Sequence, residues 1–250
     1  MNLPIFTAVQ HDTEQNDRAQ LEQHCFKLLN QYGHLIFLLD STLNPSIFDD
    51  VVNALAKKNI AYIPLAIKKD MVTSDLFLIC IDDHKVFEQV KDDLLQNLIR
   101  NKDIANDSYF VHGFGTTKIE SLEELRDQIR NKLVVSDQGR KILFRWYDPR
   151  VMIYLNDILE EKNLVSLLDN FEAWHFLHPT GFYSIESSEE RTQIKKVPLR
   201  SLNKAESIAL DLVELSNSVF QQLNDFNEVD ISQLHPVEIY KTLLEAHHNY

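Results

Sequence analysis

Short apolar runs alternate with amphipathic stretches along most of the chain, a pattern that predicts strands interleaved with helices. The run His34–Asp40 is apolar from Leu35 to Leu39, as expected for a strand that is covered on both faces. Runs of the same kind predict further strands at Ile60–Ile67, Leu76–Asp82, Ser108–Phe114 and Ile142–Tyr147. Trp174–Leu177 and Phe182–Ile185, joined through Pro179-Thr180-Gly181, predict a hairpin.

Helix predictions come from start signals that are followed by apolar residues on one face. Ser121 with Glu124, and Asn203 with Glu206, have the spacing of a capping box. Other helices are expected to start at Asn44-Pro45, near Lys85, at Asp148-Pro149 and at Pro236. The Asp148-Pro149 helix should carry Val151, Leu155, Ile158 and Leu159. The helix after Asn203 should bury the stripe Ile208, Leu212, Leu215, Val219 and Leu223.

These elements predict an α/β fold: a mixed sheet with flanking helices, followed by a small helical C-terminal part. The polar stretch Glu186–Lys196 separates the two parts, so we expect an α/β domain over residues 1–186 and a helical C-terminal lobe over residues 187–250. The chain has 250 residues, 44% hydrophobic and 25% charged, which is enough to bury a full core.

Composition and charge exclude several classes of function. The net charge is −13, whereas a nucleic-acid-binding face is basic, so no nucleic-acid partner is expected. No apolar run reaches the roughly 20 residues of a spanning helix, and the N-terminus lacks signal-peptide features, so we expect a cytoplasmic protein with no membrane partner. The five glycines form no phosphate-binding loop, since the closest pair, Gly113 and Gly115, lacks the rest of the motif, and no cofactor is expected.

The segment Arg145-Trp146-Tyr147-Asp148-Pro149-Arg150 is the densest candidate site. A structural interpretation has the strand ending at Tyr147 and Asp148 capping the next helix, with the two arginines clamping the aspartate. A catalytic interpretation makes Asp148 a base and the arginines anion binders. The structural interpretation is favoured, because the sequence supplies no second acid, nucleophile or metal-binding set beside them.

Other candidate chemistry has simpler explanations. The ten histidines, including His175, His178 and His247-His248, show no metal-binding spacing, so no metal site is expected. No serine nucleophile motif occurs, and Asp82-Asp83-His84 is explained by a strand end followed by a helix cap. Cys25 and Cys80 lie among apolar residues and are expected to be reduced and buried. We therefore expect a protein that is not an enzyme.

The stretch from Gly113 to about Trp174 resembles the effector-chaperone, or adaptor, family of type VI secretion. That family has a Ser-Leu-x-x-Leu-x-x-His-Leu-Arg motif, a glycine turn, and then Leu-x-Arg-Phe-Tyr-Asp-Pro-Arg-Val-Leu. The corresponding residues here are Ser121–Leu125, Gln128–Arg130, Gly139 and Leu143–Met152. Weaker similarity extends over about residues 30–225, including the strand that ends at Asp40. Two departures are Gln128 in place of the histidine and Thr73-Ser74-Asp75 in place of a Pro-Trp pair.

The resemblance implies an adaptor that binds a secreted effector, often through the effector's N-terminal region, and helps load it onto the spike protein of the secretion apparatus. Such a protein is expected to expose an apolar surface that its partner covers. The candidate residues lie on the C-terminal helices: Phe220, Phe226, Ile239, Tyr240, Leu243 and Leu244. Simple packing on the α/β domain is an equal alternative for them. The other functional hypotheses are an immunity-type toxin-binding protein and a small hydrolase that uses Asp148 or His84.

Overall fold

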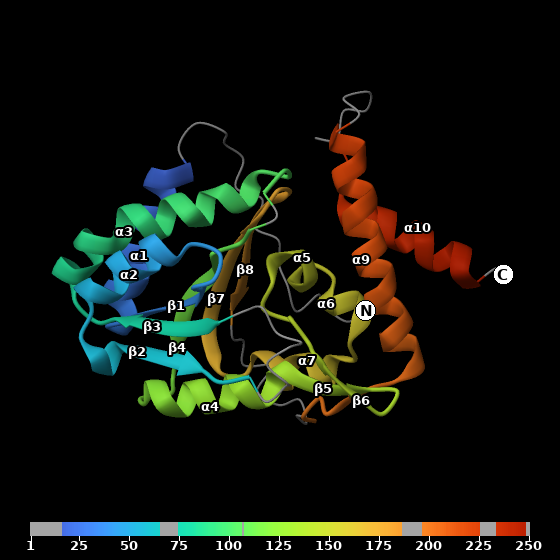
Figure 1. The fold of residues 1–250 in the computed structure, drawn as a ribbon, viewed down its shortest axis with the longest axis horizontal. Helices are drawn as coiled ribbons and strands as arrows, with labels where there is room; N and C mark the ends of the chain where they lie inside the picture. Colours follow the sequence, from blue (N-terminus) through green and yellow to red (C-terminus); the bar gives the residue numbers. More distant parts are fainter. Residues whose placement is uncertain (1–16, 66–74, 107, 187–196, 226–233, 249–250) are drawn as a thin grey trace.

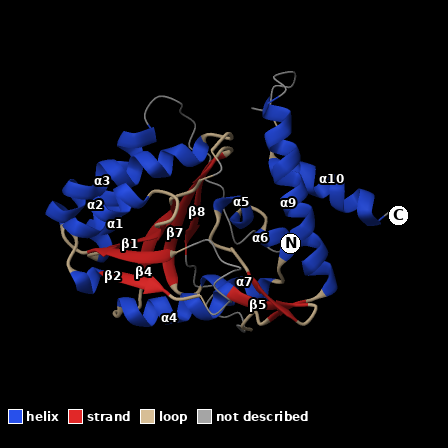
Figure 2. Ribbon diagram, viewed as in Figure 1, coloured by secondary structure: helices blue, strands red, loops and turns tan. Residues whose placement is uncertain are grey.

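The computed structural model describes residues 17–65, 75–106, 108–186, 197–225 and 234–248, and its largest feature is a six-stranded sheet (Figures 1 and 2). The strands lie in the order β2-β3-β1-β4-β7-β8, and each pairs antiparallel with its neighbours. Their bounds are β1 (Leu35–Asp40), β2 (Ile60–Ile63), β3 (Leu76–Ile81), β4 (Val111–Thr117), β7 (Phe171–His178) and β8 (Gly181–Glu186). The predicted α/β class with flanking helices is confirmed.

Both faces of this sheet are covered, because alternate side chains of a strand point to opposite sides. Leu35, Phe37 and Leu39 of β1 belong to one core cluster, with residues of the first three helices. Ile36 and Leu38 belong to a second cluster, with residues from the later part of the chain. The first helices are α1 (Asp17–Tyr32), α2 (Pro45–Ala54) and α3 (His84–Ile99), and the helix on the other face is α4 (Leu122–Leu133). The prediction that β1 is covered on both sides is therefore confirmed.

A small second sheet connects the C-terminal part to the rest of the chain. Its middle strand β5 (Val134–Asp137) pairs antiparallel with β6 (Arg140–Leu143) and parallel with β9 (Ser201–Leu202). Two helices follow, α9 (Lys204–Asp225) and α10 (Pro236–His248), at one side of the molecule (Figure 1). Val213 and Tyr240 belong to the same core cluster as Trp174 of the large sheet. The domain division at residue 186 stays a prediction, and the described residues on its two sides share this cluster.

The helix starts lie where the local signals predict them. Asn203 and Glu206 bond each other's backbone N–H, at 3.0 and 2.8 Å, which completes a capping box at α9. At α4 the box is half formed. The Ser121 hydroxyl accepts the N–H of Glu124 at 3.3 Å, while the Glu124 carboxylate accepts a hydrogen bond from the Gln128 side chain. Asn44 precedes α2, but its side chain makes no cap bond.

Some predicted bounds are wrong. The strand predicted to reach Tyr147 ends at Leu143, since the aromatic side chains that follow turn into the core and not into a ladder. The strand predicted from Ser108 begins at Val111. The helix predicted after Asp148-Pro149 is two single turns, α5 (Pro149–Met152) and α6 (Leu155–Ile158). The end of the Ile60–Ile67 prediction lies outside the described residues. Pattern analysis does not predict α1, β5 or α7 (Glu161–Leu168).

Gly113 and Gly115 have a packing role in the centre of the large sheet. A Cβ atom on Gly113 would lie 2.7 Å from the backbone oxygen of His175, and one on Gly115 would overlap the backbone of Ala173. We therefore expect Gly115→Ala to lower the free energy of unfolding by about 1–3 kcal/mol or more, because β4 and β7 must separate. Urea denaturation measures this, with Asn53→Ala on the exposed side of α2 as control. An unchanged midpoint for Gly115→Ala would contradict the close strand approach.

Candidate functional site

The candidate site is the corner formed by residues 144–150, between β6 and α5. The side chains of Trp146 and Tyr147 are fully buried in this corner. Asp148 is the N-cap of α5, and its Oδ1 accepts the backbone N–H of Arg150 at 3.0 Å. Pro149 follows at the first helical position, where its missing N–H costs nothing. The predicted role of Asp148 as a helix cap is confirmed.

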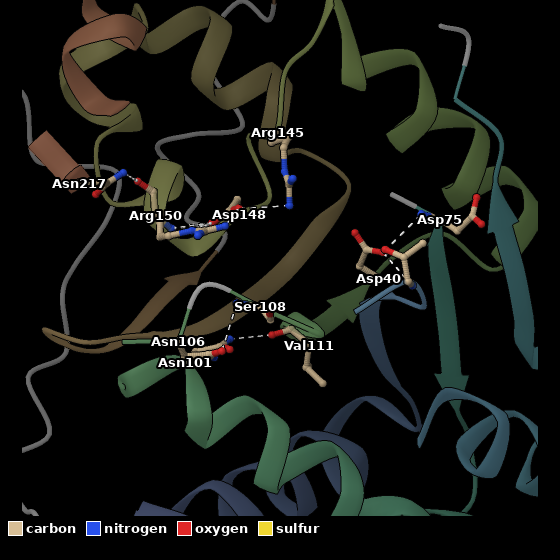
Figure 3. Close-up of polar contacts among 11 residues, drawn as sticks. Asp40, Asp75, Asn101, Asn106, Ser108, Val111, Arg145, Asp148, Arg150 and Asn217 are labelled. Carbon is tan, nitrogen blue, oxygen red and sulfur yellow. Dashed lines mark hydrogen bonds and ion pairs between the residues drawn. The ribbon is translucent and has the colours of Figure 1, made fainter. Parts of the chain in front are cut away.

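Both arginines of the corner converge on Asp148 (Figure 3). Arg150 donates two hydrogen bonds to the carboxylate, from Nε at 3.0 Å and from Nη2 at 2.8 Å. Nη2 of Arg145 lies 3.4 Å from Oδ2. Burial acts to raise the pKa of Asp148, but the hydrogen bonds and charge of Arg150, with smaller contributions from His112 and Arg145, hold the pKa well below its usual range. The buried carboxyl group is therefore ionised and paired.

The corner is also bonded to the C-terminal helices. Nδ2 of Asn217 in α9 donates to the backbone oxygen of Arg150 at 3.0 Å (Figure 3). The Tyr154 hydroxyl donates to Oδ1 of the same asparagine at 3.0 Å and lies 3.2 Å from the hydroxyl of Ser216. Ser216 in turn donates to the backbone oxygen of Pro236, where α10 begins. A change at Asp148 is therefore expected to reach α9 and α10.

Two further side chains, those of Tyr109 and His112, complete the corner, and sequence analysis predicted neither. The guanidinium of Arg150 lies over the ring of Tyr109, at 4.6 Å from its centroid. His112 is fully buried, with its ring 4.7 Å from that of Tyr147. Neither ring nitrogen of His112 has a hydrogen-bond partner among the described residues. Burial lowers the pKa of His112 to about 4, so the ring is neutral at neutral pH. No local pattern links β4 to this corner, because only the folded sheet brings them together.

A cavity of about 510 Å³ opens between this corner and α9. Arg145, Asp148 and Arg150 line it, together with Tyr109 and His178. Apolar lining residues include Ile142 and Leu143 of β6 and Val213 and Phe220 of α9, and α9 also contributes the polar side chains of Glu214 and Asn217. The cavity therefore combines charged groups with apolar lining residues on two sides.

No family model, curated protein or solved structure matches this chain. Its function must therefore be inferred from the residues and their geometry.

The second catalytic candidate, His84, lies at the start of α3. The preceding Asp83 caps this helix and accepts the N–H groups of Lys85 and Val86 at 2.6 and 3.2 Å. Oδ1 of Asp82 accepts a hydrogen bond from Asn59 at 2.9 Å. These contacts confirm the prediction of a strand end followed by a helix cap, with Asp83 as the capping residue.

His175 and His178 are buried at the end of β7 and do not converge on a common centre. The Nδ1 atom of His175 lies 2.7 Å from the Ser184 hydroxyl, and its Nε2 lies 3.3 Å from Nε2 of His24. Nδ1 of His178 accepts the backbone N–H of Thr180 at 3.2 Å, which leaves Nε2 as the protonated nitrogen of the neutral ring. Burial lowers the pKa of each of these histidines to about 3.

Within the described ranges, no three His, Cys, Asp or Glu side chains gather where they could hold a metal ion. No helix in the part of the chain that the structure describes has both the length and the apolar character to cross a bilayer. Cys25 and Cys80 are free thiols, Cys25 buried and Cys80 half-buried, and burial raises the pKa of Cys80 to about 11.

The predicted partner-binding residues are only partly available. Phe220 and Tyr240 are buried and cannot form an exposed surface, because α9 and α10 pack them against the body. Ile239, Leu243 and Leu244 are half-buried. Phe226 lies outside the described residues. Packing, the alternative explanation, therefore holds for two members of the set.

Helix α9 is rotated from its predicted orientation. Its buried positions include Ala209, Val213, Ser216 and Phe220, which are spaced three or four residues apart. The stripe that was predicted to be buried lies to one side of these. Its members Ile208, Leu212, Val219 and Leu223 are half-buried, and Leu215 is 47% exposed. Helix α9 thus has one stripe that the body covers fully and a second, apolar stripe that is partly exposed, although Leu212 of the second stripe also packs against the core cluster that contains Trp174. We call the second stripe, residues 208, 212, 215, 219 and 223, the outer stripe.

Proposed function

We propose that this protein is a cytoplasmic adaptor that binds a secreted effector and helps load it onto the spike of a type VI secretion apparatus. The observation that carries the proposal is the outer stripe of α9. Its five apolar residues repeat at the spacing that places them on one helix face, and Leu215 is among the large hydrophobic side chains most exposed in the described structure. A partner that covered this stripe would remove apolar surface from water, which is the main driving force of association.

The corner around Asp148 supports a binding protein over a hydrolase. A general base needs an available oxygen within hydrogen-bond reach of its substrate. Oδ1 of Asp148 already accepts two hydrogen bonds from Arg150, and Oδ2 faces the guanidinium groups of both arginines. The carboxylate is thus already bonded to the N-terminus of α5 and paired with Arg145 and Arg150. The resemblance of residues 120–152 to the adaptor family supplies the class of partner.

Replacing Leu215 tests the proposal. We expect Leu215→Glu to abolish co-purification of a co-expressed effector, because a charge in the outer stripe must be desolvated on binding. The thermal midpoint of the free protein should change little, since Leu215 is 47% exposed. The matched control is Leu43→Glu, which places the same charge at an exposed leucine outside the C-terminal helices. Equal co-purification of the effector with both variants would contradict binding through the outer stripe.

Fragments of the effector separate the adaptor from the immunity-type hypothesis. An adaptor is expected to retain the N-terminal fragment, whereas an immunity protein would retain the C-terminal catalytic fragment. Recovery of general chaperones alone would overturn both.

A further inference from the structure

We propose that the cavity between the Asp148 corner and α9 binds an acidic side chain carried by an apolar segment of the partner polypeptide. This inference rests on the proposed function and names what the effector must present. The cavity, of about 510 Å³, is large enough for a few side chains. Both of its guanidinium groups, those of Arg145 and Arg150, lie on the corner, so a ligand carboxylate should face them.

Arg145 is the residue that selects the carboxylate. Arg150 satisfies Asp148 through two hydrogen bonds, whereas Arg145 makes one ion pair among the described residues, at 3.4 Å. That distance is longer than a charge-assisted hydrogen bond. Nε of Arg145 is buried and has no hydrogen-bond partner in the described part of the chain. About a third of the Arg145 side chain remains exposed, at 35%. Because Nε has almost no accessible surface, an incoming carboxylate would bind the exposed end of the Arg145 guanidinium, which lies 3.4 Å from Asp148.

Glu214 of α9 also lines the cavity, so the site holds two guanidinium groups and two carboxylates. Attraction for an anion therefore depends on the local donors of Arg145 and not on a net positive charge. Glu214 is exposed and opposes an incoming carboxylate. Removing the charge of Glu214 should therefore strengthen binding of the carboxylate, whereas removing the charge of Arg145 should weaken it.

The apolar lining of the cavity indicates why the acidic residue should lie within the partner's segment and not at its end. Ile142 and Leu143 line the cavity from β6, and Val213 and Phe220 line it from α9. An acidic residue with apolar neighbours on both sides places one neighbour against each wall. A terminal carboxylate has a neighbour on one side only, so it would leave one wall in water.

Capped peptides test this on the full-length protein. The probes are acetyl-Ala-Leu-Glu-Leu-Ala-amide, the same peptide with Gln in place of Glu, and acetyl-Ala-Leu-Gln-Leu-Ala with a free carboxylate. Titration followed by amide NMR should show the Glu peptide binding about tenfold more tightly than the Gln peptide, as expected for a hydrogen bond to a charged group. Equal binding of the Glu and Gln peptides would overturn the inference, as would tightest binding of the free-carboxylate peptide.

Variants assign the effect to the cavity. Arg145→Gln should bring the Glu-to-Gln preference down to about one, and Glu214→Gln should increase it, by about two- to fivefold for one exposed charge. Arg126→Gln, in an exposed pair on α4, is the control and should leave the preference unchanged. If Arg145→Gln fails to fold, Ser218→Trp decides, because this exposed residue lines the cavity and a large ring should block both peptides. Unaltered binding to Ser218→Trp would overturn the assignment.

The inference and the proposed function can fail separately. Peptide binding without a Glu preference, with the effector still co-purifying, removes the inference alone. A Glu preference that depends on Arg145, with no effector recovered, supports the cavity and removes the adaptor.

Discussion

Replacing Asp148 with alanine is expected to lower the free energy of unfolding by about 3–5 kcal/mol, because it leaves two guanidinium groups at a corner without their shared carboxylate. The substitution also removes the cap of α5, which costs about 1 kcal/mol on its own. Asp148→Asn should cost less, since asparagine can still accept the N–H of Arg150 while losing the charge. Urea denaturation followed by tryptophan fluorescence measures both, because Trp146 and Trp174 are fully buried.

Asp127→Asn is the control for this series, since Asp127 pairs with Arg126 on the exposed side of α4 and should denature like the parent protein. An Asp148→Ala protein with parental stability would show that the clamp is dispensable. A different outcome would end the adaptor account altogether: turnover of a small molecule by the parent protein that is lost in Asp148→Asn. That result would return Asp148 to the role of a base.

Local signals predicted the corner well because its parts are neighbours in sequence. The capping residues Asp83, Asp148 and Asn203 bond backbone groups two or three residues away, so the sequence contains both partners. The end of β6 could not be found in this way. Phe144–Tyr147 is as apolar as a strand, and only packing against the large sheet decides that these residues leave the ladder.

The orientation of α9 and the position of the cavity could not be predicted from the sequence, because both depend on tertiary packing. Helix α9 carries two apolar stripes, and hydrophobicity alone favours the one with larger side chains. The body instead covers the side that holds Ala209 and Ser216, whose small side chains allow a close approach, as the 3.2 Å contact between the hydroxyl groups of Ser216 and Tyr154 shows. The cavity draws Tyr109, His178 and Asn217 from three distant segments. No spacing rule joins such segments before the chain has folded.

Acid is expected to destabilise this protein strongly between pH 6.5 and about pH 4, because of three buried histidines. The pKa values of His112, His175 and His178 fall from 6.5 to about 4, 3 and 3, chiefly through burial. Below pH 6.5 the unfolded chain therefore binds protons that the folded chain does not, so stability falls as the pH falls. Each histidine contributes up to about 1.4 kcal/mol per pH unit, or about 4 kcal/mol per unit for the three.

Asp148 affects stability only at lower pH and does not obscure the contribution of the histidines. Its pKa is depressed in the folded chain, so its contribution is complete above 3.8 and is lost only as the pH falls below that value. Unfolding free energies from urea titrations at pH 7.5, 6.5, 5.5 and 4.5 therefore report chiefly the histidines, including His235, whose pKa burial also lowers, whereas the raised pKa of Asp157 acts in the opposite sense. A flat profile from pH 6.5 to pH 4.5 would show that these rings are charged or exposed in the folded protein.

His112→Phe separates one histidine from the others. Its ring packs edge-on against Tyr147 and its two nitrogens lack partners among the described residues, so phenylalanine should fit and should remove an unsatisfied polar group. We expect this variant to be at least as stable as the parent at pH 7.5 and to lose about a third of the slope below pH 6.5. His247→Gln, at the exposed end of α10, is the matched control. An unchanged slope in His112→Phe would mean that His112 takes up its proton while the chain is still folded, and that the ionised Asp148 beside it compensates the cost of burial.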